Sequence, residues 1–346
     1  SIAFGETFQE GLWDTDDLTK LLQIVIENET AFTASDGSLS LAGRVLDWLQ
    51  HSLRRNNRSG SKANIASHYD LSNDLFSLFL DPSMTYSSAV YQSEEQPLAD
   101  AQRNKLRQLI SKAGITEHDH VLEIGSGWGS FAIEAARETG CRVTTITLSE
   151  KQAREARERI RAAGLEQQIS VLLCDYRDVT GAFDKIVSIE MLEAVGKEYF
   201  GEFFAACERL LKPNGVLVVQ VITMPEQRYA RYCRSSDFIQ KYIFPGAHIP
   251  SLEALTAAAA KRSNFIVEDL ENIGVHYART LREWHETFIE KKDAVKELGF
   301  DDKFFRAWRY YFSYCEAGFA TRILSNLQLV FTRPNNKRLP LTAQCS

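Results

Sequence analysis

The chain has 346 residues, of which 44% are hydrophobic, 25% charged and 11% aromatic. This composition excludes a disordered, collagen-like or low-complexity protein and supplies enough apolar side chains for a large buried core. The 40 basic and 46 acidic residues give a net charge of −6, so no overall attraction to nucleic acid is expected.

Hydropathy and cysteine usage indicate the cellular compartment. No run of 18 or more apolar residues occurs, so we expect no membrane-spanning helix. The first residues also lack the basic-then-apolar pattern of a signal peptide. The six cysteines are scattered without a CxxC pair, which is typical of free thiols in a reducing compartment. We therefore expect a soluble, cytoplasmic protein.

The N-terminal part is predicted to be helical and to end in a linker. Apolar residues recur at helical spacing in 14–28 and again in 39–55, and a polar Gly/Ser-containing stretch follows at 54–64. Four cations of this stretch either belong to a solvated hinge or contact anionic lipid head groups: Arg54, Arg55, Arg58 and Lys62. We assign 1–60 to a partial helical N-terminal domain with its linker.

Strand and helix patterns alternate along the rest of the chain. Strand-like runs lie at 121–125, 142–148, 169–175, 185–190 and 215–223, and later at 265–273 and 326–333. Helical patterns lie between them at 129–140, 149–164 and 199–211, and aromatic-rich ones at 281–295 and 304–319. This alternation predicts a doubly wound α/β sheet with a helical cap.

A glycine-rich turn follows the first predicted strand. Glu123 precedes Gly125, Gly127 and Gly129, and glycines at a strand end let the backbone turn tightly and approach a ligand. A strand-to-helix turn without a ligand is the alternative. The spacing departs from the dinucleotide-binding pattern GxGxxG, and no GxxxxGK[ST] phosphate loop exists, so ATP chemistry has no anchor.

The next two strand ends add polar side chains at the same edge of the sheet. The second strand ends in Thr147-Leu148, and the third in Asp175-Tyr176, where a carboxylate and a ring could contact an amine and a base. These features together indicate a nucleoside-binding site.

The motif E-x-G-x-G-x-G resembles the S-adenosylmethionine site of Rossmann-like methyltransferases, and the chain as a whole resembles the cyclopropane-fatty-acid synthase family. That family includes the mycolic acid cyclopropane synthases. The matching segments are 66–89, 121–132, 147–152, 188–196, 235–246 and 310–319, the last two being most similar to the plant-type branch. Residues 1–50 resemble the back part of the family's helical N-terminal domain.

The resemblance implies a class I methyltransferase fold with a mostly parallel seven-stranded sheet and a helical substrate cap. The methyltransferase domain would span 61–346, with cap elements at about 61–98, 225–262 and 279–322. S-adenosylmethionine is the implied cofactor. The implied cofactor-binding residues are Tyr86, Ser87, Glu123, Gly125, Gly127, Thr147, Leu148, Gln152, Asp175 and Tyr176.

The resemblance also implies a base, usually a bound bicarbonate, that deprotonates a carbocation so that a ring closes. The catalytic positions implied here are Glu193, Tyr311, Ile222, Ser88, Gln220 and His68. Ser88 and Gln220 stand where the family has Cys and His, and both still donate hydrogen bonds. His68 has a structural role near the linker as its alternative, and Glu193 that of a simple helix-start carboxylate.

Other histidines and aromatic residues leave alternatives open. His248 either reshapes the substrate pocket or lies in an exposed turn. His118 and His120 resemble a metal pair, but no third ligand is nearby in the sequence, so we expect a solvated loop and no metal. The aromatic residues of 308–314 either line an acyl tunnel or form ordinary core.

Three functions are compatible with these motifs. The first is a synthase that adds a methylene to an unsaturated phospholipid acyl chain or another alkene-bearing small molecule, with peripheral membrane contact and a homodimer. The second is a C- or N-methyltransferase of a prenyl or alkaloid-like molecule, which Ser88 and Gln220 favour because simple methyl transfer needs no held base. The third is a silent cofactor- or lipid-binding module, which the intact motifs disfavour.

Overall fold

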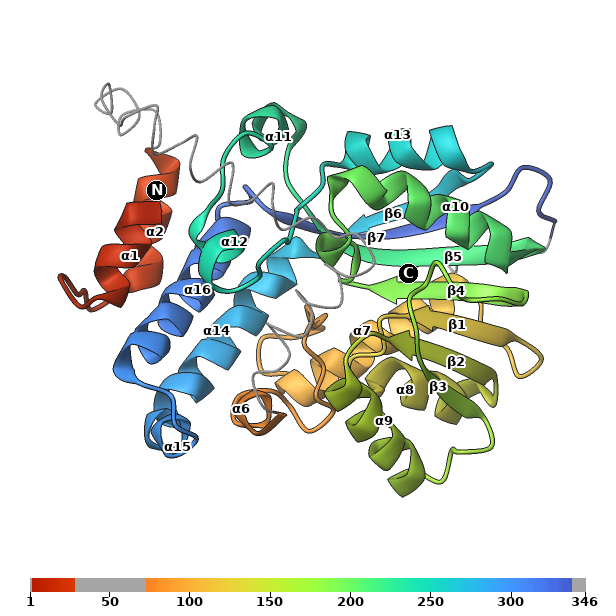
Figure 1. Cartoon of the computed structure of the whole chain (residues 1–346), viewed down its shortest axis with the longest axis horizontal. Helices are drawn as coiled ribbons and strands as arrows, with labels where there is room; N and C mark the ends of the chain where they lie inside the picture. The colour runs from red at the N-terminus through yellow and green to blue at the C-terminus, as the bar shows by residue number, and fades with distance from the viewer. Residues whose placement is uncertain (1, 29–72, 338–346) are drawn as a thin grey trace.

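The computed structural model describes residues 2–28 and 73–337, and its centre is a seven-stranded sheet (Figure 1). The strands are β1 (His120–Ile124), β2 (Arg142–Thr147), β3 (Ile169–Leu173), β4 (Phe183–Ile189), β5 (Leu211–Thr223), β6 (Ile266–Asn272) and β7 (Ser325–Thr332). Their order in the sheet is β3-β2-β1-β4-β5-β7-β6, and only β7 runs antiparallel to its neighbours. The predicted fold class, with a mostly parallel sheet, is confirmed.

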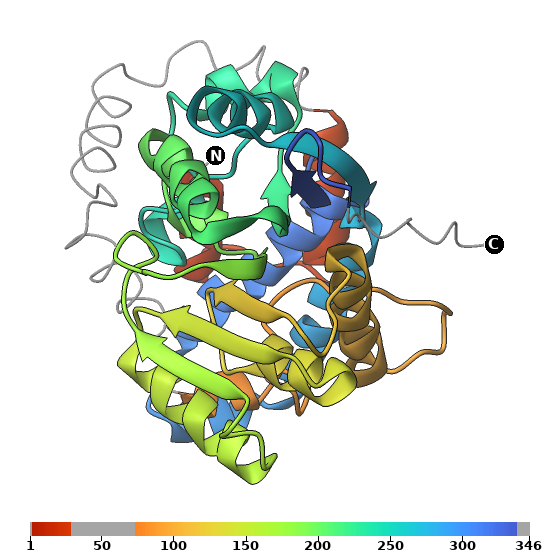
Figure 2. The ribbon, with the colours of Figure 1, turned by 90° about the vertical axis from the view of Figure 1, so that its right-hand side faces the viewer.

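Two helical layers cover the faces of this sheet (Figure 2). One layer holds α7 (Leu98–Ala113), α8 (Ser130–Thr139) and α9 (Glu150–Ala162), and the other α10 (Phe200–Leu210) and α13 (Leu252–Arg262). Each layer packs its own apolar core against the strands. Within the described ranges, no helix combines the length and apolar composition needed to cross a bilayer.

The remaining helices lie beyond the carboxyl ends of the parallel strands. They are α1 (Ile2–Gln9), α2 (Leu18–Glu27), α6 (Asn73–Ser77), α11 (Glu226–Tyr232), α12 (Phe238–Tyr242), α14 (Gly274–Glu290), α15 (Lys292–Glu297) and α16 (Asp302–Ala320). Short 3₁₀ turns at Leu192–Ala194 and Lys197–Tyr199 lead into α10. Most of these cap helices share a third core, whose largest buried side chains include Trp284 and Trp308.

Side-chain caps explain where several helices begin. Ser149 accepts a hydrogen bond from the backbone N–H of Gln152 at the start of α9, and Asp301 accepts one from Phe304 at the start of α16. Such caps satisfy backbone donors that the first helical turn leaves unpaired. The predicted helix at 281–295 begins earlier, at Gly274, and is divided into α14 and α15. The Asn272 side chain accepts the Gly274 N–H where α14 begins.

The N-terminal helices are anchored to the cap (Figure 1). The Arg306 guanidinium of α16 donates to the carbonyl oxygens of Phe8 and Trp13 and to the Asp14 carboxylate, at 2.6 to 2.8 Å. It also lies 4.2 Å from the centre of the Phe8 ring. The predicted helix at 39–55, the linker at 54–64 and the boundary at 60/61 lie outside the described residues, so the division into two domains stays a prediction.

Helix α1 also contacts α12. The Glu6 carboxylate accepts hydrogen bonds from Lys241 and Tyr242, at 2.8 and 2.6 Å. Gly5 faces the Phe238 ring so closely that a Cβ at this position would overlap it. Because a residue with a side chain does not fit here, glycine sets the separation of the two helices.

The anchoring by Arg306 predicts a specific loss of stability. Arg306→Leu should lower the free energy of unfolding by about 2 kcal/mol, because three hydrogen bonds to a charged donor are lost from a mostly buried site. Urea unfolding of the full chain measures this. Lys303→Leu is the control, since its pair with Glu10 is half exposed and should leave stability nearly unchanged. Equal losses in the two variants would contradict the anchoring role.

Candidate active site

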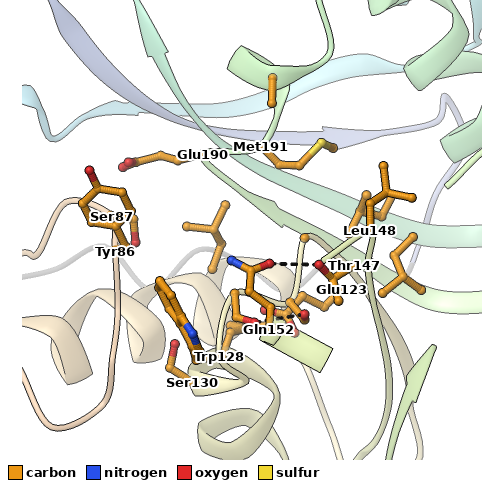
Figure 3. Close-up of a pocket in the computed structure, with 18 of the residues that line it drawn as sticks. Tyr86, Ser87, Glu123, Trp128, Ser130, Thr147, Leu148, Gln152, Glu190 and Met191 are labelled. Atoms are coloured by element: carbon orange, nitrogen blue, oxygen red, sulfur yellow. Dashed lines mark hydrogen bonds between the residues drawn. The ribbon is translucent and has the colours of Figure 1, made fainter. Parts of the chain in front are cut away.

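One cavity opens at the carboxyl ends of β1, β2 and β3, where a doubly wound sheet is expected to bind its ligand (Figure 3). Ten predicted cofactor-binding residues all line it: Tyr86, Ser87, Glu123, Gly125, Gly127, Thr147, Leu148, Gln152, Asp175 and Tyr176. The sequence thus identified residues that the fold brings together from four separate segments. Their contacts with a cofactor stay a prediction.

The glycine turn forms one wall of this cavity. Gly125 has a φ of +98°, and its N–H and that of Ser126 donate to the carbonyl oxygen of Ile146 on β2. A Cβ on Gly125 would approach the Met191 side chain to 3.1 Å, whereas a Cβ on Gly127 would meet no atom within 4 Å. The turn therefore leaves backbone exposed to open space, as close approach to a nucleoside requires.

The end of β2 explains the motif at 147–152. The Thr147 hydroxyl donates to the Gln152 side-chain oxygen at 2.9 Å and accepts from the backbone N–H of Ser149 (Figure 3). Ser149 also caps α9 through the Gln152 backbone. These linked hydrogen bonds hold the Gln152 amide over the cavity in a defined orientation.

The end of β3 provides an aromatic surface. The Asp175 carboxylate accepts two hydrogen bonds from the Arg177 guanidinium, at 2.8 and 2.6 Å. This pairing fixes the backbone of Tyr176, which lies between the two residues. The Tyr176 ring is buried against Phe203, and its hydroxyl has no hydrogen-bond partner among the described residues. Burial raises the pKa of Tyr176, so the phenol stays neutral.

Lys105 also lines this cavity, although it was not predicted from the sequence. Its Nζ donates to the Ser87 hydroxyl at 2.6 Å, and burial lowers the pKa of Lys105 to about 8. Glu123, on the same side, accepts from the Thr145 hydroxyl, and burial raises its pKa to about 8. A lysine on the apolar face of α7, between Ala101 and Leu109, is the signal that could have identified it.

A second cavity lies between the strand ends and the cap, and it is mainly apolar. Its lining includes Ile222, Ile239, Phe244, Ile249, Leu281, Phe319 and Leu324. Tyr86, Glu190 and Ala194 line both cavities. The two cavities therefore adjoin and share a wall at these three residues.

Three predicted catalytic residues line this apolar cavity: Glu193, Ile222 and Tyr311. One carboxylate oxygen of Glu193 accepts the backbone N–H of Ile222 at 2.6 Å, and the other has no partner among the described residues. Burial, helped by the charge of Glu190, raises the pKa of Glu193 to about 8. The Tyr311 and Tyr86 hydroxyls are 2.9 Å apart.

Glu190 follows β4 with a φ of +48° and was not predicted from the sequence as a site residue. Its Oε1 accepts from the Ser88 N–H at 3.0 Å, from Gln220 Nε2 at 2.8 Å and from Asn326 Nδ2 at 2.6 Å. Its Oε2 accepts from the Tyr277 hydroxyl at 2.7 Å. Ser88 and Gln220 are fully buried and line neither cavity, so these two predicted catalytic residues act on Glu190.

The other histidines have separate environments. His68 lies outside the described residues. His248 is buried, with Nε2 3.0 Å from the Tyr229 hydroxyl, which excludes the exposed-turn interpretation. His120 bonds Thr144 and His118 is exposed. In 2–28 and 73–337, no group of three or more His, Cys, Asp or Glu side chains is arranged to hold a metal.

Comparison with known proteins gives a consistent set of matches. The family model described as mycolic acid cyclopropane synthetase matches residues 56–329. The tuberculostearic acid methyltransferase UfaA1 of Mycobacterium tuberculosis is 40% identical over 96% of this chain and 79% of its own length. The cyclopropane-fatty-acyl-phospholipid synthase of Escherichia coli is 34% identical over 96% of this chain and 83% of its own.

A solved structure is also similar. Mycolic acid cyclopropane synthase CmaA1, in complex with SAH (S-adenosylhomocysteine) and CTAB, superposes with a TM-score of 0.73 and 28% identity. The match covers 79% of this chain and 98% of that one.

The raised pKa of Glu193 predicts a pH dependence of stability. Between its unfolded value of 4.5 and its folded value of about 8, the folded protein keeps a proton that the unfolded chain releases. The contribution of the neutral Glu193 carboxyl to the free energy of unfolding is therefore complete below pH 4.5. It is lost as the pH rises toward 8, by up to about 1.4 kcal/mol per pH unit.

Glu193→Gln should abolish this part of the pH dependence. Urea unfolding of the wild type and the variant, at several values between about pH 5 and pH 8, should show the variant gaining relative stability as the pH rises. Glu198→Gln, at an exposed position, should follow the wild type. Parallel curves for the wild type and Glu193→Gln would show that Glu193 ionises normally.

Proposed function

Because this chain belongs to the mycolic acid cyclopropane synthetase family, we propose that it transfers a one-carbon unit from S-adenosylmethionine to the cis double bond of an unsaturated phospholipid acyl chain. A cyclopropane ring is the proposed product. The observation that carries the proposal is the shared wall formed by Tyr86, Glu190 and Ala194. A sulfonium methyl in the first cavity would meet an alkene in the second at this wall.

The first cavity fits the cofactor by its donor set and shape. The open glycine turn would approach the nucleoside, the Tyr176 ring would contact the base, and Tyr86 with Ser87 would close over the methionine end. When bound, S-adenosylmethionine supplies an electrophilic methyl group. The SAH complex of CmaA1 supports this assignment.

The second cavity fits an acyl chain better than a polar amine. Aliphatic and aromatic side chains make up most of its lining, which would exclude water from the reacting carbons. The Tyr86 ring lies 6.4 Å from Phe244, and Phe244 lies 5.7 Å from Tyr311, so three aromatic rings border the shared wall. Their faces would stabilise the carbocation that forms when the alkene takes the methyl.

The lipid substrate leads to two further parts of the proposal. Peripheral contact with a membrane surface would give the enzyme access to acyl chains, and a homodimer would present two such sites to one surface. The cations at 54, 55, 58 and 62 that motivated the first part lie outside the described residues. Pelleting with anionic and neutral liposomes, at low and high salt, tests the contact.

Analysis of the lipid product is the direct test of this function. The full-length protein is incubated with S-adenosylmethionine and an unsaturated phospholipid, and the lipid is examined by mass spectrometry and NMR. We expect a mass gain of one CH₂ unit with high-field cyclopropyl protons. Detection of a methyl branch or an exocyclic methylene would change the proposed product but not the proposed reaction class. Stabilisation by SAH without any lipid product would contradict the proposal.

The apolar cavity predicts a substitution that blocks the acyl chain alone. Ala247→Phe places a ring in this cavity and should reduce turnover of a long-chain substrate at least ~10-fold, because the chain no longer fits. The thermal shift produced by SAH should stay as in the wild type, because Ala247 does not line the first cavity. Ala257→Phe, on the exposed side of α13, is the control. A loss of SAH binding in Ala247→Phe would contradict separate cavities.

A further inference from the structure

The donors assigned to an external bicarbonate are occupied by the protein itself. The resemblance gives this role to positions 88, 193, 220, 222 and 311. In the structure, the Ser88 N–H and Gln220 Nε2 both donate to Oε1 of Glu190, and the Ile222 N–H donates to Glu193. Glu190 thus accepts the hydrogen bonds of Ser88 and Gln220, and Glu193 accepts that of Ile222. Because these donors already have carboxylate partners, the residues do not fit bicarbonate as a ligand.

We propose that Glu190 is the base of this enzyme, its own carboxylate taking the place of a bound anion. This rests on the proposed function, in which a cation forms beside the wall that Glu190 shares. The methyl carbon leaves sulfur and bonds to one alkene carbon, so the positive charge develops on the other. A C–H bond of the transferred methyl then breaks, its electrons close the ring, and the proton moves to the Glu190 carboxylate.

The hydrogen bonds around Glu190 suit it to this role. Three donors bind Oε1, whereas Oε2 accepts only the Tyr277 hydroxyl among the described residues and keeps a lone pair for a proton. Gln328 Nε2 donates to the Gln220 side-chain oxygen at 3.1 Å, which turns the amide so that its N–H faces Glu190. The donors thus fix the carboxylate as an acceptor at the shared wall.

The backbone at this position supports a functional role. Glu190 has a φ of +48°, a left-handed conformation that is strained for a residue other than glycine. The side chain is retained there and aimed toward Tyr86 (Figure 3). Glu193 cannot take the proton as readily, because burial raises its pKa to about 8 and keeps it protonated at neutral pH.

Two substitutions at Glu190 test the proposal. Glu190→Gln keeps the size of the side chain but has no basic oxygen, and turnover should fall at least ~100-fold. Glu190→Gly adopts the same φ without strain and leaves space for a small anion. Its turnover should be equally low in CO₂-free buffer and should recover about tenfold with formate or bicarbonate. Wild-type turnover should be the same with and without bicarbonate.

The readouts separate a base from a structural residue. SAH should stabilise both variants, which shows that they fold and bind the cofactor, and Glu198→Gln should act as wild type. With a CD₃-labelled cofactor, the wild-type ring should keep two deuterium atoms. Glu190→Gln should accumulate products of the undeprotonated cation, such as water adducts that keep three. A purely structural role of Glu190 would not change the ratio of products with two deuterium atoms to products with three.

Two results would overturn the proposal. Turnover of Glu190→Gln within about threefold of wild type, or a wild type that requires bicarbonate, would remove Glu190 from the role of base. The wild-type enzyme is assayed alongside, so the absence of any lipid product would refute the proposed function itself, and with it this proposal. If only the proposal about Glu190 is wrong, the wild-type enzyme still makes the lipid product.

Discussion

Four hydrogen bonds onto one carboxylate, that of Glu190, connect the sheet to the cap. The donors come from the loop before α7, from β5, from β7 and from α14. A buried donor without a partner costs about 1–3 kcal/mol, so each of these elements is held where its donor reaches the carboxylate. The shared wall between the cavities therefore depends on this one side chain.

The two neighbouring carboxylates, Glu190 and Glu193, have different environments. Four donors surround the first, whereas the second accepts one backbone N–H and is otherwise buried among apolar groups. Acid–base sites commonly contain pairs of titratable groups whose surroundings differ in this way. The apolar cavity thus has one group that holds a proton and one that accepts hydrogen bonds, three residues apart in the same segment.

The fold and the lining of the first cavity could be predicted from the sequence because both follow from local patterns. Alternating strand and helix signals define the sheet, and the residues after β1, β2 and β3 must meet at its carboxyl edge. Glu190 was missed because its donors Tyr277 and Asn326 are far away in the sequence, and no local pattern pairs them. Likewise, Ser88 and Gln220 were predicted to donate hydrogen bonds, but no local pattern indicated that Glu190 is their shared partner.

The close packing of Gly5 against Phe238 extends the influence of the N-terminal helix. No described residue of α1 lines either cavity, yet α12 contributes Ile239 to the apolar cavity one position after Phe238. A side chain at position 5 would displace α12 and thereby move part of the lining of the apolar cavity. Natural variation in substrate range can therefore arise at a residue remote from the chemistry, and a survey confined to the cavity would overlook it.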